Sequence, residues 1–378
     1  MKLLLVGTGG YAKNYVKLLL ENQIPDVIWE GIVDPYYSAC EYKENIDALG
    51  IPVYATMEEF YQRHTANLAV ISTPTFLHCS QSICALKNGS HVLCEKPAAP
   101  TVKEAEEMLE AQKTYGRFIA IGYQWSYSEA IQKLKADVAA GLFGKPVSLK
   151  TAISWPRGKA YYSRGGGWAG RVERDGHLIL DSIASNACAH YLHNMLFLLG
   201  KEPEKAADPI LLQAECYRAN EIENFDTCCI KMKTEDGARL YFAATHAAEY
   251  RRNPQFVYTF QKGKVFYSQD EGSQIVAEFS DGSRKTYGDP FENPFKKLWD
   301  AIECAKKGTS PLCTVETALP HVKLIEKLYQ TTPVQSFAKE LLGTEPKLDA
   351  IYVKGLYEAL YRAYEQEALF TETDPTLF

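Results

Sequence analysis

An apolar run that ends in three glycines is the feature that most constrains this chain. Leu3–Val6 has the pattern of a buried strand, and Gly7, Gly9 and Gly10 separate it from a helix-like stretch. In the spacing Gly7-x-Gly9-x-x-Ala12, the first small residue permits a tight turn. The second lets the backbone approach a pyrophosphate, and the third lets helix and strand pack closely. The pattern predicts a phosphate-binding strand–turn–helix unit, although an ordinary strand-to-helix turn is the alternative that this motif alone leaves open.

A carboxylate follows at the distance that a dinucleotide site requires. Trp29–Pro35 has the pattern of a second strand, and Asp34 stands near its end, about 20 residues beyond Ala12. Such a carboxylate accepts hydrogen bonds from the ribose hydroxyls of the adenosine. The residues after Asp34 are Pro35, Tyr36 and Tyr37, so no arginine stands beside it to accept a 2′-phosphate. The two features together predict NAD as cofactor, with NADP less favoured, rather than a carboxylate that only caps a turn.

Composition excludes several classes of partner. The 378 residues are 46% hydrophobic and 23% charged, with a net charge of −6, which is typical of globular proteins with two or three domains. An acidic chain without a basic block does not favour nucleic acid or an anionic membrane surface. No apolar run reaches the ~18 residues of a membrane span. The ten cysteines form no Cys-x-x-Cys pair, which favours free thiols in a cytoplasmic protein.

Strand and helix signals alternate over residues 1–121. Apolar runs at 3–6, 28–33, 68–72, 91–94 and 118–121 alternate with helix-like stretches at 36–49, 57–64, 77–87 and 102–115. Strands that are buried on both faces and alternate with amphipathic helices predict a doubly wound parallel sheet. We therefore expect an N-terminal Rossmann domain over residues 1–121, with its ligands at the carboxyl ends of the strands.

After Gly122 the pattern changes to longer segments that alternate in polarity. They are separated by Asp-Gly and Lys-Gly turn signals and predict a large, mainly antiparallel open sheet. Helices are expected at 130–140, 293–307, 315–330 and 348–367, and a long glycine-containing loop at 154–168. Residues 122–378 are thus expected to form an α+β domain that binds substrate. Strands with apolar groups on both faces predict that one sheet face covers another subunit.

Three further segments carry a family resemblance. "VISTPTFLH" (70–78) and "VLCEKPAAPTVKEAEEML" (92–109) follow strand signals, and "GHLILDS" and "AHYLHNMLFLLG" fall within residues 176–200. With the glycine motif, this series resembles the glucose–fructose oxidoreductase/inositol dehydrogenase (Gfo/Idh/MocA) family over residues 1–330. The resemblance implies hydride transfer between a nicotinamide and a carbinol carbon of a sugar, polyol or glycoside. It also implies pairing through the C-terminal sheet, as a homodimer or homotetramer.

The resemblance assigns the catalytic groups. Lys96, held out of a helix by Pro97, matches the catalytic lysine, and its peptide bond to Pro97 is expected to be cis. His190 matches the histidine that accepts the hydroxyl proton. The family commonly has an aspartate four residues before that histidine, where this chain has Asn186. Either Asp181 keeps the carboxylate role through a longer loop, or Asn186 replaces it; we favour Asp181 as catalytic and Asn186 as a substrate contact.

The resemblance also implies the binding residues. Those expected to contact the cofactor are Gly7, Thr8, Gly9, Gly10, Tyr11, Ala12, Asp34, Ser72, Thr73, Pro74, Thr75, His78, Glu95, Lys96 and Gln124. Those expected to contact substrate are Lys96, Tyr123, Trp125, Trp155, Arg157, Asn186, His190 and His193. No metal is expected, because a nicotinamide enzyme of this family needs none. The alternatives are a glycoside hydrolase that retains NAD and oxidises the sugar transiently, and a non-catalytic NAD-binding regulator.

Overall fold

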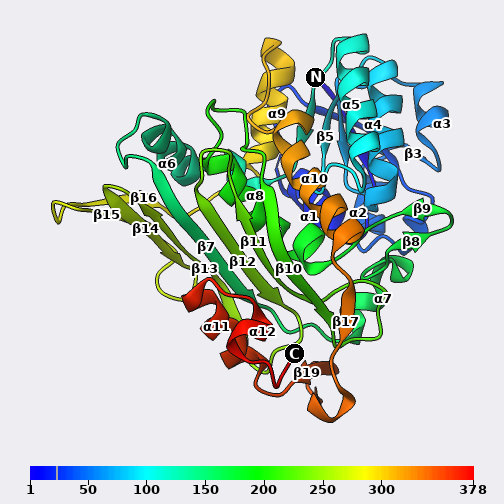
Figure 1. Cartoon of the computed structure of the whole chain (residues 1–378). Coiled ribbons are helices and arrows are strands. Elements are labelled where there is room, and N and C mark those ends of the chain that lie inside the picture. The colour runs from blue at the N-terminus through cyan, green and yellow to red at the C-terminus, as the bar shows by residue number, and fades with distance from the viewer. Residues whose placement is uncertain (23) are drawn as a thin grey trace. The chain divides into compact units, whose positions relative to one another are not determined.

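The computed structural model describes residues 1–22 and 24–378 and divides into two compact units (Figure 1). The first comprises Met1–Tyr123 and Phe295–Leu319, and the second comprises Gln124–Pro294 and Pro320–Phe378. The sequence placed one boundary between residues 121 and 122, and the first unit runs to Tyr123. Residues 295–319 also belong to the first unit, so the chain leaves this unit and returns to it.

The first unit is built on a six-stranded parallel sheet, which confirms the Rossmann prediction. Its strands are β1 (Lys2–Val6), β2 (Ile28–Val33), β3 (Val53–Tyr54), β4 (Leu68–Ile71), β5 (His91–Cys94) and β6 (Ile119–Ile121). Their order is β3-β2-β1-β4-β5-β6, which is the order of a dinucleotide-binding sheet. The short β3 carries only two residues, and no sequence signal marked it. The carboxyl ends of β1, β2, β4 and β5 share one edge.

The helices of the first unit connect these strands. They are α1 (Ala12–Glu21), α2 (Lys43–Ala48), α3 (Met57–Tyr61), α4 (His78–Lys87) and α5 (Val102–Tyr115). A sixth helix, α9 (Lys296–Lys307), comes from the returning segment. It joins this unit because Leu298, Ala301 and Ile302 pack into the same hydrophobic core as Leu3 and Leu5.

The second unit contains a nine-stranded sheet, mixed but mainly antiparallel, as expected. In chain order the strands are β7 (Pro146–Ser154), β10 (Ile210–Arg218), β11 (Thr227–Lys233), β12 (Arg239–Thr245), β13 (Arg252–Phe260), β14 (Gly263–Ser268), β15 (Ile275–Phe279), β16 (Arg284–Gly288) and β17 (Val334–Ser336). Their order across the sheet is β16-β15-β14-β13-β7-β12-β11-β10-β17. Two neighbouring pairs, β7 with β12 and β10 with β17, are parallel.

Helices of the same chain cover both faces of this sheet. On one face, α6 (Glu129–Ala139) and α8 (Ala189–Leu198) pack into a core with Leu149, Ile153 and Phe242. On the other, α11 (Leu356–Gln366) and α12 (Phe370–Thr373) cover residues of β7, β10, β11 and β12, as Figure 1 shows. The apolar outer face was expected to need a second subunit. Over these strands that reasoning is wrong, because the C-terminal helices bury the face.

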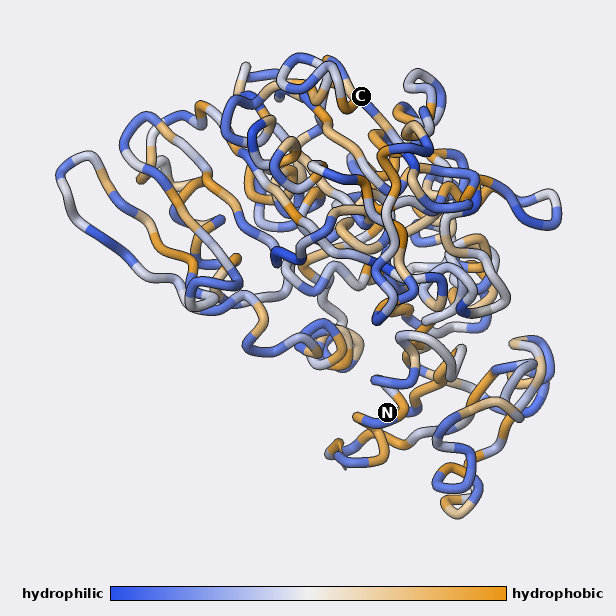
Figure 2. Tube along the Cα trace, turned by 90° about the horizontal axis from the view of Figure 1, so that it is seen from below, coloured by the Kyte–Doolittle hydropathy of each residue, from blue (hydrophilic) through white to orange (hydrophobic). Residues whose placement is uncertain are grey.

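Beyond these helices, the outer strands keep an alternating pattern. Buried and partly exposed residues alternate along β13 and β14, and hydrophobic and hydrophilic residues intermix along the chain in Figure 2. A further hairpin, formed by β18 (Leu342–Glu345) and β19 (Ala350–Val353), precedes α11. Among the described residues, no helix combines the length and the apolar character that crossing a bilayer requires.

The loop expected at residues 154–168 is wrong for most of its length. After β7 the chain forms α7 (Lys159–Gly167), which Gly158 precedes in an extended conformation. The Arg164 guanidinium lies 3.7 Å from the centre of the Tyr161 ring, one helical turn away. This stacking gives the segment local helical contacts that its glycines alone did not predict.

Candidate functional site

The glycine turn after β1 has the geometry that a dinucleotide site requires. Gly7 has φ +93°, and a Cβ at this position would lie 2.6 Å from the carbonyl oxygen of Ser72. A Cβ at Gly9 would meet no atom within 4 Å, so the backbone there is open to a ligand. Ala12 is fully buried at the start of α1. The three small residues therefore serve a close turn, an open backbone and helix packing, as the motif predicts.

The turn also fixes Asp34 at the end of β2. One carboxylate oxygen of Asp34 accepts hydrogen bonds from the Thr8 backbone N–H at 2.8 Å and the Thr8 hydroxyl at 2.5 Å. The other accepts one from the backbone N–H of Tyr36 at 2.8 Å. The carboxylate is only partly buried. Two loops thus hold an oriented acceptor beside the phosphate-binding turn, which is where a ribose hydroxyl donates in sites of this kind.

The loop after β4 carries partly exposed residues and leads to the buried His78. Ser72, Thr73 and Pro74 are partly exposed, whereas His78 is 1% exposed. Its Nδ1 lies 2.8 Å from the carbonyl oxygen of Pro97 and its Nε2 lies 3.0 Å from that of Thr73. Burial lowers the pKa of His78. Both ring nitrogens of His78 thus lie at backbone carbonyl oxygens of two loops, and its contact with the cofactor stays a prediction.

Glu95, Lys96 and Pro97 follow β5 at the same sheet edge as the glycine turn. The Lys96–Pro97 peptide bond is cis, which confirms that prediction. The Glu95 carboxylate accepts a hydrogen bond from the Tyr15 hydroxyl at 2.6 Å and forms an ion pair with Lys297. A Cβ at Gly122 would lie 2.9 Å from a Glu95 carboxylate oxygen, so the glycine leaves room for this network.

In the second unit, Asp181 and Asn186 are bonded to each other. The Asn186 side-chain amide donates to Asp181 Oδ1 at 2.8 Å, and the Gly170 backbone N–H donates to Oδ2 at 2.6 Å. Leu180, just before, has φ +49°, and Ile183–Ala187 forms a π-helical turn. Such departures from regular backbone are frequent at functional sites. The two residues that were treated as alternatives are thus hydrogen-bonded to each other, and the role of each stays a prediction.

The two histidines of α8 differ in their surroundings. His190 is partly exposed in the first turn of the helix. His193, however, is 1% exposed, stacks on Phe197, and has Nε2 3.2 Å from the Ser126 hydroxyl. Burial holds the pKa of His193 well below its usual range. His193 is buried in the core, and its contact with substrate stays a prediction.

The aromatic residues predicted to contact substrate differ in their exposure to solvent. Tyr123 and Trp125 are fully buried, and the Trp125 ring packs against four aromatic rings of the core. Both rings are enclosed by the protein, and their contact with substrate stays a prediction. Trp155 is partly exposed, donates from Nε1 to Asn253 at 2.9 Å, and lies 5.5 Å from the guanidinium of Arg157.

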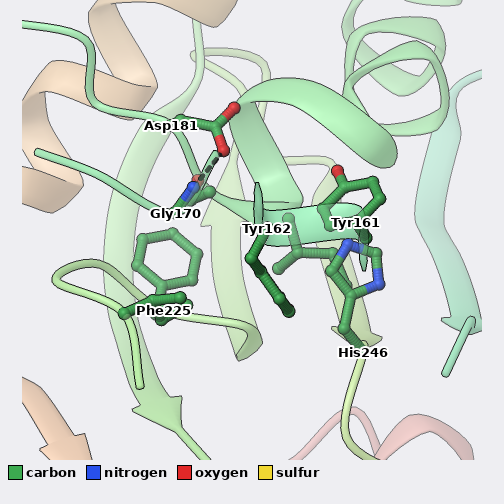
Figure 3. Close-up of a pocket in the computed structure, with 9 residues that line it drawn as sticks. Tyr161, Tyr162, Gly170, Asp181, Phe225 and His246 are labelled. Carbon is green, nitrogen blue, oxygen red and sulfur yellow. Dashed lines mark hydrogen bonds between the residues drawn. The ribbon is translucent and has the colours of Figure 1, made fainter. Parts of the chain in front are cut away.

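A pocket in the second unit contains residues that sequence reasoning missed. It has an empty volume of about 180 Å³ and is lined by Tyr161, Tyr162, Gly170, Asp181, Ser182, Ile183, Ile222, Phe225 and His246 (Figure 3). Only Asp181 of these was among the predicted site residues. Burial raises the pKa of Tyr161 to about 12 and raises that of Tyr162 as well. The one available signal for His246 was its place directly after an expected strand.

The comparisons with known proteins agree with this arrangement. Residues 1–123 match the family described as "Oxidoreductase family, NAD-binding Rossmann fold", and residues 131–266 match the Gfo/Idh/MocA C-terminal domain. The rhizopine catabolism protein MocA of Rhizobium meliloti is 25% identical over 166 residues, which is 43% of this chain and 50% of that protein. Inositol 2-dehydrogenase of Renibacterium salmoninarum is 28% identical over 153 residues, 40% of this chain and 45% of that protein. The matches thus span about half the length of these curated relatives.

A solved structure shares the fold over most of both chains. The WlbA dehydrogenase of Chromobacterium violaceum, in complex with NADH and UDP-GlcNAcA, has a TM-score of 0.72 at 22% identity. The alignment covers 88% of this chain and 93% of that one. Among the residues that the structure describes here, no cluster of three or more histidine, cysteine, aspartate or glutamate side chains could hold a metal ion. The chain belongs to the Gfo/Idh/MocA oxidoreductase family, and its first unit is an NAD-binding Rossmann domain.

Proposed function

We propose that this protein is an NAD-dependent dehydrogenase that acts on a carbinol carbon of a sugar or polyol. One observation carries the proposal. The glycine turn and Lys96 follow β1 and β5 of one parallel sheet, and the carboxyl ends of those strands share an edge. A lysine therefore follows a strand at the sheet edge where dinucleotides bind in sheets of this order, which supports a role for its cation beside the nicotinamide. The family and the named activities of the relatives support the same reaction class.

The reaction requires the protein to bind the cofactor, to stabilise the developing charge, to accept a proton and to orient the substrate. Bound NAD would supply the hydride acceptor, and the glycine turn and Asp34 would hold its pyrophosphate and ribose. In our proposal Lys96 stabilises the negative charge that develops on the substrate oxygen. His190 accepts the hydroxyl proton, since a histidine titrates near neutral pH. Asn186 contacts the substrate, and Asp181 fixes the orientation of its amide through the 2.8 Å hydrogen bond.

The test is a panel of polyols, aldoses and glycosides incubated with NAD while NADH absorbance is followed. We expect at least one class to yield NADH, and we expect Lys96→Ala to lower turnover at least ~100-fold while NAD still binds. Lys103→Ala is the matched control, because the Lys103 side chain is 86% exposed on α5. No NADH from any compound would contradict the proposal. Tightly held NAD with glycoside cleavage and no net NADH would indicate the hydrolase instead.

A further inference from the structure

One polar atom in the pocket of the second unit has no hydrogen-bond partner among the residues that the structure describes. His246 directly follows β12 and is 2% exposed. Its Nδ1 lies 2.8 Å from the backbone carbonyl oxygen of Trp155, whereas its Nε2 has no hydrogen-bond partner among the described residues. Buried side-chain nitrogens nearly always have a partner from the protein or from ordered water. The described residues therefore do not supply the hydrogen-bond partner that the buried Nε2 of His246 requires.

The backbone determines what kind of partner this atom can take. A carbonyl oxygen only accepts hydrogen bonds, so the ring hydrogen sits on Nδ1 and Nε2 carries a lone pair. Burial, together with the nearby charges of Arg157 and Arg164, lowers the pKa of His246 to about 3. The imidazole is neutral near pH 7, and Nε2 is an acceptor. Its missing partner must be a donor, such as a hydroxyl group.

The surroundings of this atom define the ligand further. The rings of Tyr161 and His246 meet edge to face, with centroids 5.3 Å apart. Figure 3 shows His246 beside Tyr161, and Asp181 on the opposite side of the labelled group. Phe225 and Ile222 add apolar surface to the lining. Hydrophobic walls with a few fixed polar groups are typical of small-molecule sites. Here two of those groups, Asp181 and His246, are hydrogen-bond acceptors, which suits a compound that carries several hydroxyls.

We propose that His246 is a specificity-determining residue whose Nε2 accepts a hydrogen bond from a hydroxyl of the sugar or polyol. This inference rests on the proposed function and narrows its substrate class to compounds with a hydroxyl that reaches this pocket. An analogue that lacks the hydroxyl would leave a buried acceptor unsatisfied and would bind more weakly. His246 thus selects the substrate, and the transfer of proton and hydride belongs to the other groups.

The first test follows the atom itself and needs no turnover. In the ¹⁵N-labelled protein saturated with NADH, the Nε2 resonance of His246 is recorded during titration with myo-inositol, D-glucose and glycerol. A resonance of an unprotonated nitrogen that moves with at least one probe is the expected result. If Nε2 carries a proton before any probe is added, it cannot accept a hydrogen bond, and the proposal is overturned. If no probe moves the resonance, water is the only partner of Nε2, and the proposal is overturned as well.

The second test uses whichever panel compound yields NADH. We expect His246→Phe, which keeps a ring beside Tyr161 but removes the acceptor, to raise KM ~10-fold or more and to change kcat less. His246→Gln, whose amide can both donate to Trp155 and accept from a hydroxyl, should restore much of the affinity. His177→Phe, at an exposed histidine, is the control for His246→Phe.

The outcomes separate this inference from the proposed function. An unchanged KM in a folded His246→Phe protein would overturn the role of His246 while leaving the dehydrogenase assignment intact. If no panel compound is oxidised, the proposed function fails, and the resonance of Nε2 still decides whether His246 binds a hydroxyl compound. A loss confined to kcat, as expected for Lys96→Ala, would also contradict a binding role.

Discussion

The ammonium group of Lys297 forms an ion pair with the carboxylate of Glu95, 202 residues away in the chain. The two side chains are 0% and 9% exposed. Burial is the largest single influence and opposes the charge on Lys297, but Glu95 and Tyr11 together outweigh it and raise the pKa of Lys297. The Glu95 carboxylate also lies 3.4 Å from the backbone nitrogen of Lys96. Helix α9 thereby anchors the turn that carries the proposed catalytic lysine.

Lys297→Met should strongly destabilise the protein, because it leaves the Glu95 carboxylate buried without a counter-charge. Breaking a buried pair in this way costs about 3–5 kcal/mol in the free energy of unfolding. Urea denaturation measures the change. Lys296→Met is the adjacent control, since Lys296 pairs with Asp300 in a partly exposed position and should cost less than about 1 kcal/mol.

A double variant tests whether the isolated charge causes this loss. Lys297→Met combined with Glu95→Gln removes both charges and should recover much of the stability lost in Lys297→Met alone. Equal stability of the Lys296→Met and Lys297→Met proteins would refute the anchoring role. If the double variant is less stable than Lys297→Met, packing and not charge explains the loss.

Asp34→Ser should weaken NAD binding about tenfold or more and relax discrimination against NADP, because hydrogen bonds to a charged acceptor are lost. Fluorescence titration with NADH and NADPH measures both effects. Glu30→Gln, which changes a carboxylate on the same strand that pairs with Lys2, is the control and should leave both affinities near wild type. Equal or better use of NADP by the unmodified protein would contradict the proposed NAD preference.

The sequence predicted what local patterns determine. The buried strands and the glycine turn each depend on residues within one short segment, and the Asp34 position depends on a fixed spacing. Helix starts were less certain: the helix expected at 36–49 begins only at Lys43, and the one expected at 348–367 begins only at Leu356, after strand β19. The parallel sheet followed because strands that are apolar on both faces need helices on both sides. The cis peptide at Lys96 came from the family resemblance and could not have been derived from the spacing of residues.

What the sequence could not show depends on contacts between distant segments. The buried Nε2 of His193 contacts the Ser126 hydroxyl, which is 67 residues away in the chain. The ion pair between Lys297 of α9 and Glu95 likewise joins distant segments. The missing partner of His246 is visible only once Trp155 is placed beside it. The hydrogen bond between Asp181 and Asn186 forms next to a π-helical turn, which no propensity predicts.

Acid should destabilise the first unit in part through His91. Its Nδ1 accepts a hydrogen bond from the Phe118 backbone N–H at 3.1 Å, and burial and then Arg117 lower its pKa to about 4. The unfolded state therefore binds a proton below about pH 6.5 that the folded state refuses until about pH 4. The contribution of His91 to the free energy of unfolding is complete above about pH 6.5 and is lost as the pH falls from about 6.5 to about 4.

Replacing His91 with asparagine tests this dependence, because the asparagine side-chain oxygen can accept the same hydrogen bond without titrating. Urea midpoints measured at pH 7 and at pH 4.5 should fall less for His91→Asn than for the wild type. His64→Asn is the control, since His64 is partly exposed and bonds to Glu30. An identical loss in the wild type and in His91→Asn would show that His91 does not carry the effect.

Self-association through the sheet stays a prediction, and the structure narrows where it can occur. Val257, Phe266 and Val276 are direct neighbours across β13, β14 and β15 and are all partly exposed. If the protein is a dimer or tetramer through this face, Phe266→Glu should shift it toward the monomer in light scattering at micromolar concentration. Tyr329→Glu, at a residue 48% exposed on α10 (Val315–Thr331), should not. A monomeric wild type would refute the prediction.

The hydrogen bond between Asp181 and Asn186 predicts that the two residues contribute to activity as a unit. Asp181→Asn should lower turnover roughly 10²-fold, because it replaces a carboxylate that fixes the Asn186 amide and the Gly170 N–H. Asn186→Ala should act chiefly on KM, since Asn186 is the proposed substrate contact. The double variant should be little worse than Asp181→Asn alone, because residues in one network do not add. Asp175→Asn, at a carboxylate 82% exposed in the preceding segment, controls for the same substitution. Losses that multiply in the double variant would show that Asp181 and Asn186 act independently, and Asp181 would then be a structural residue of the Gly170 turn.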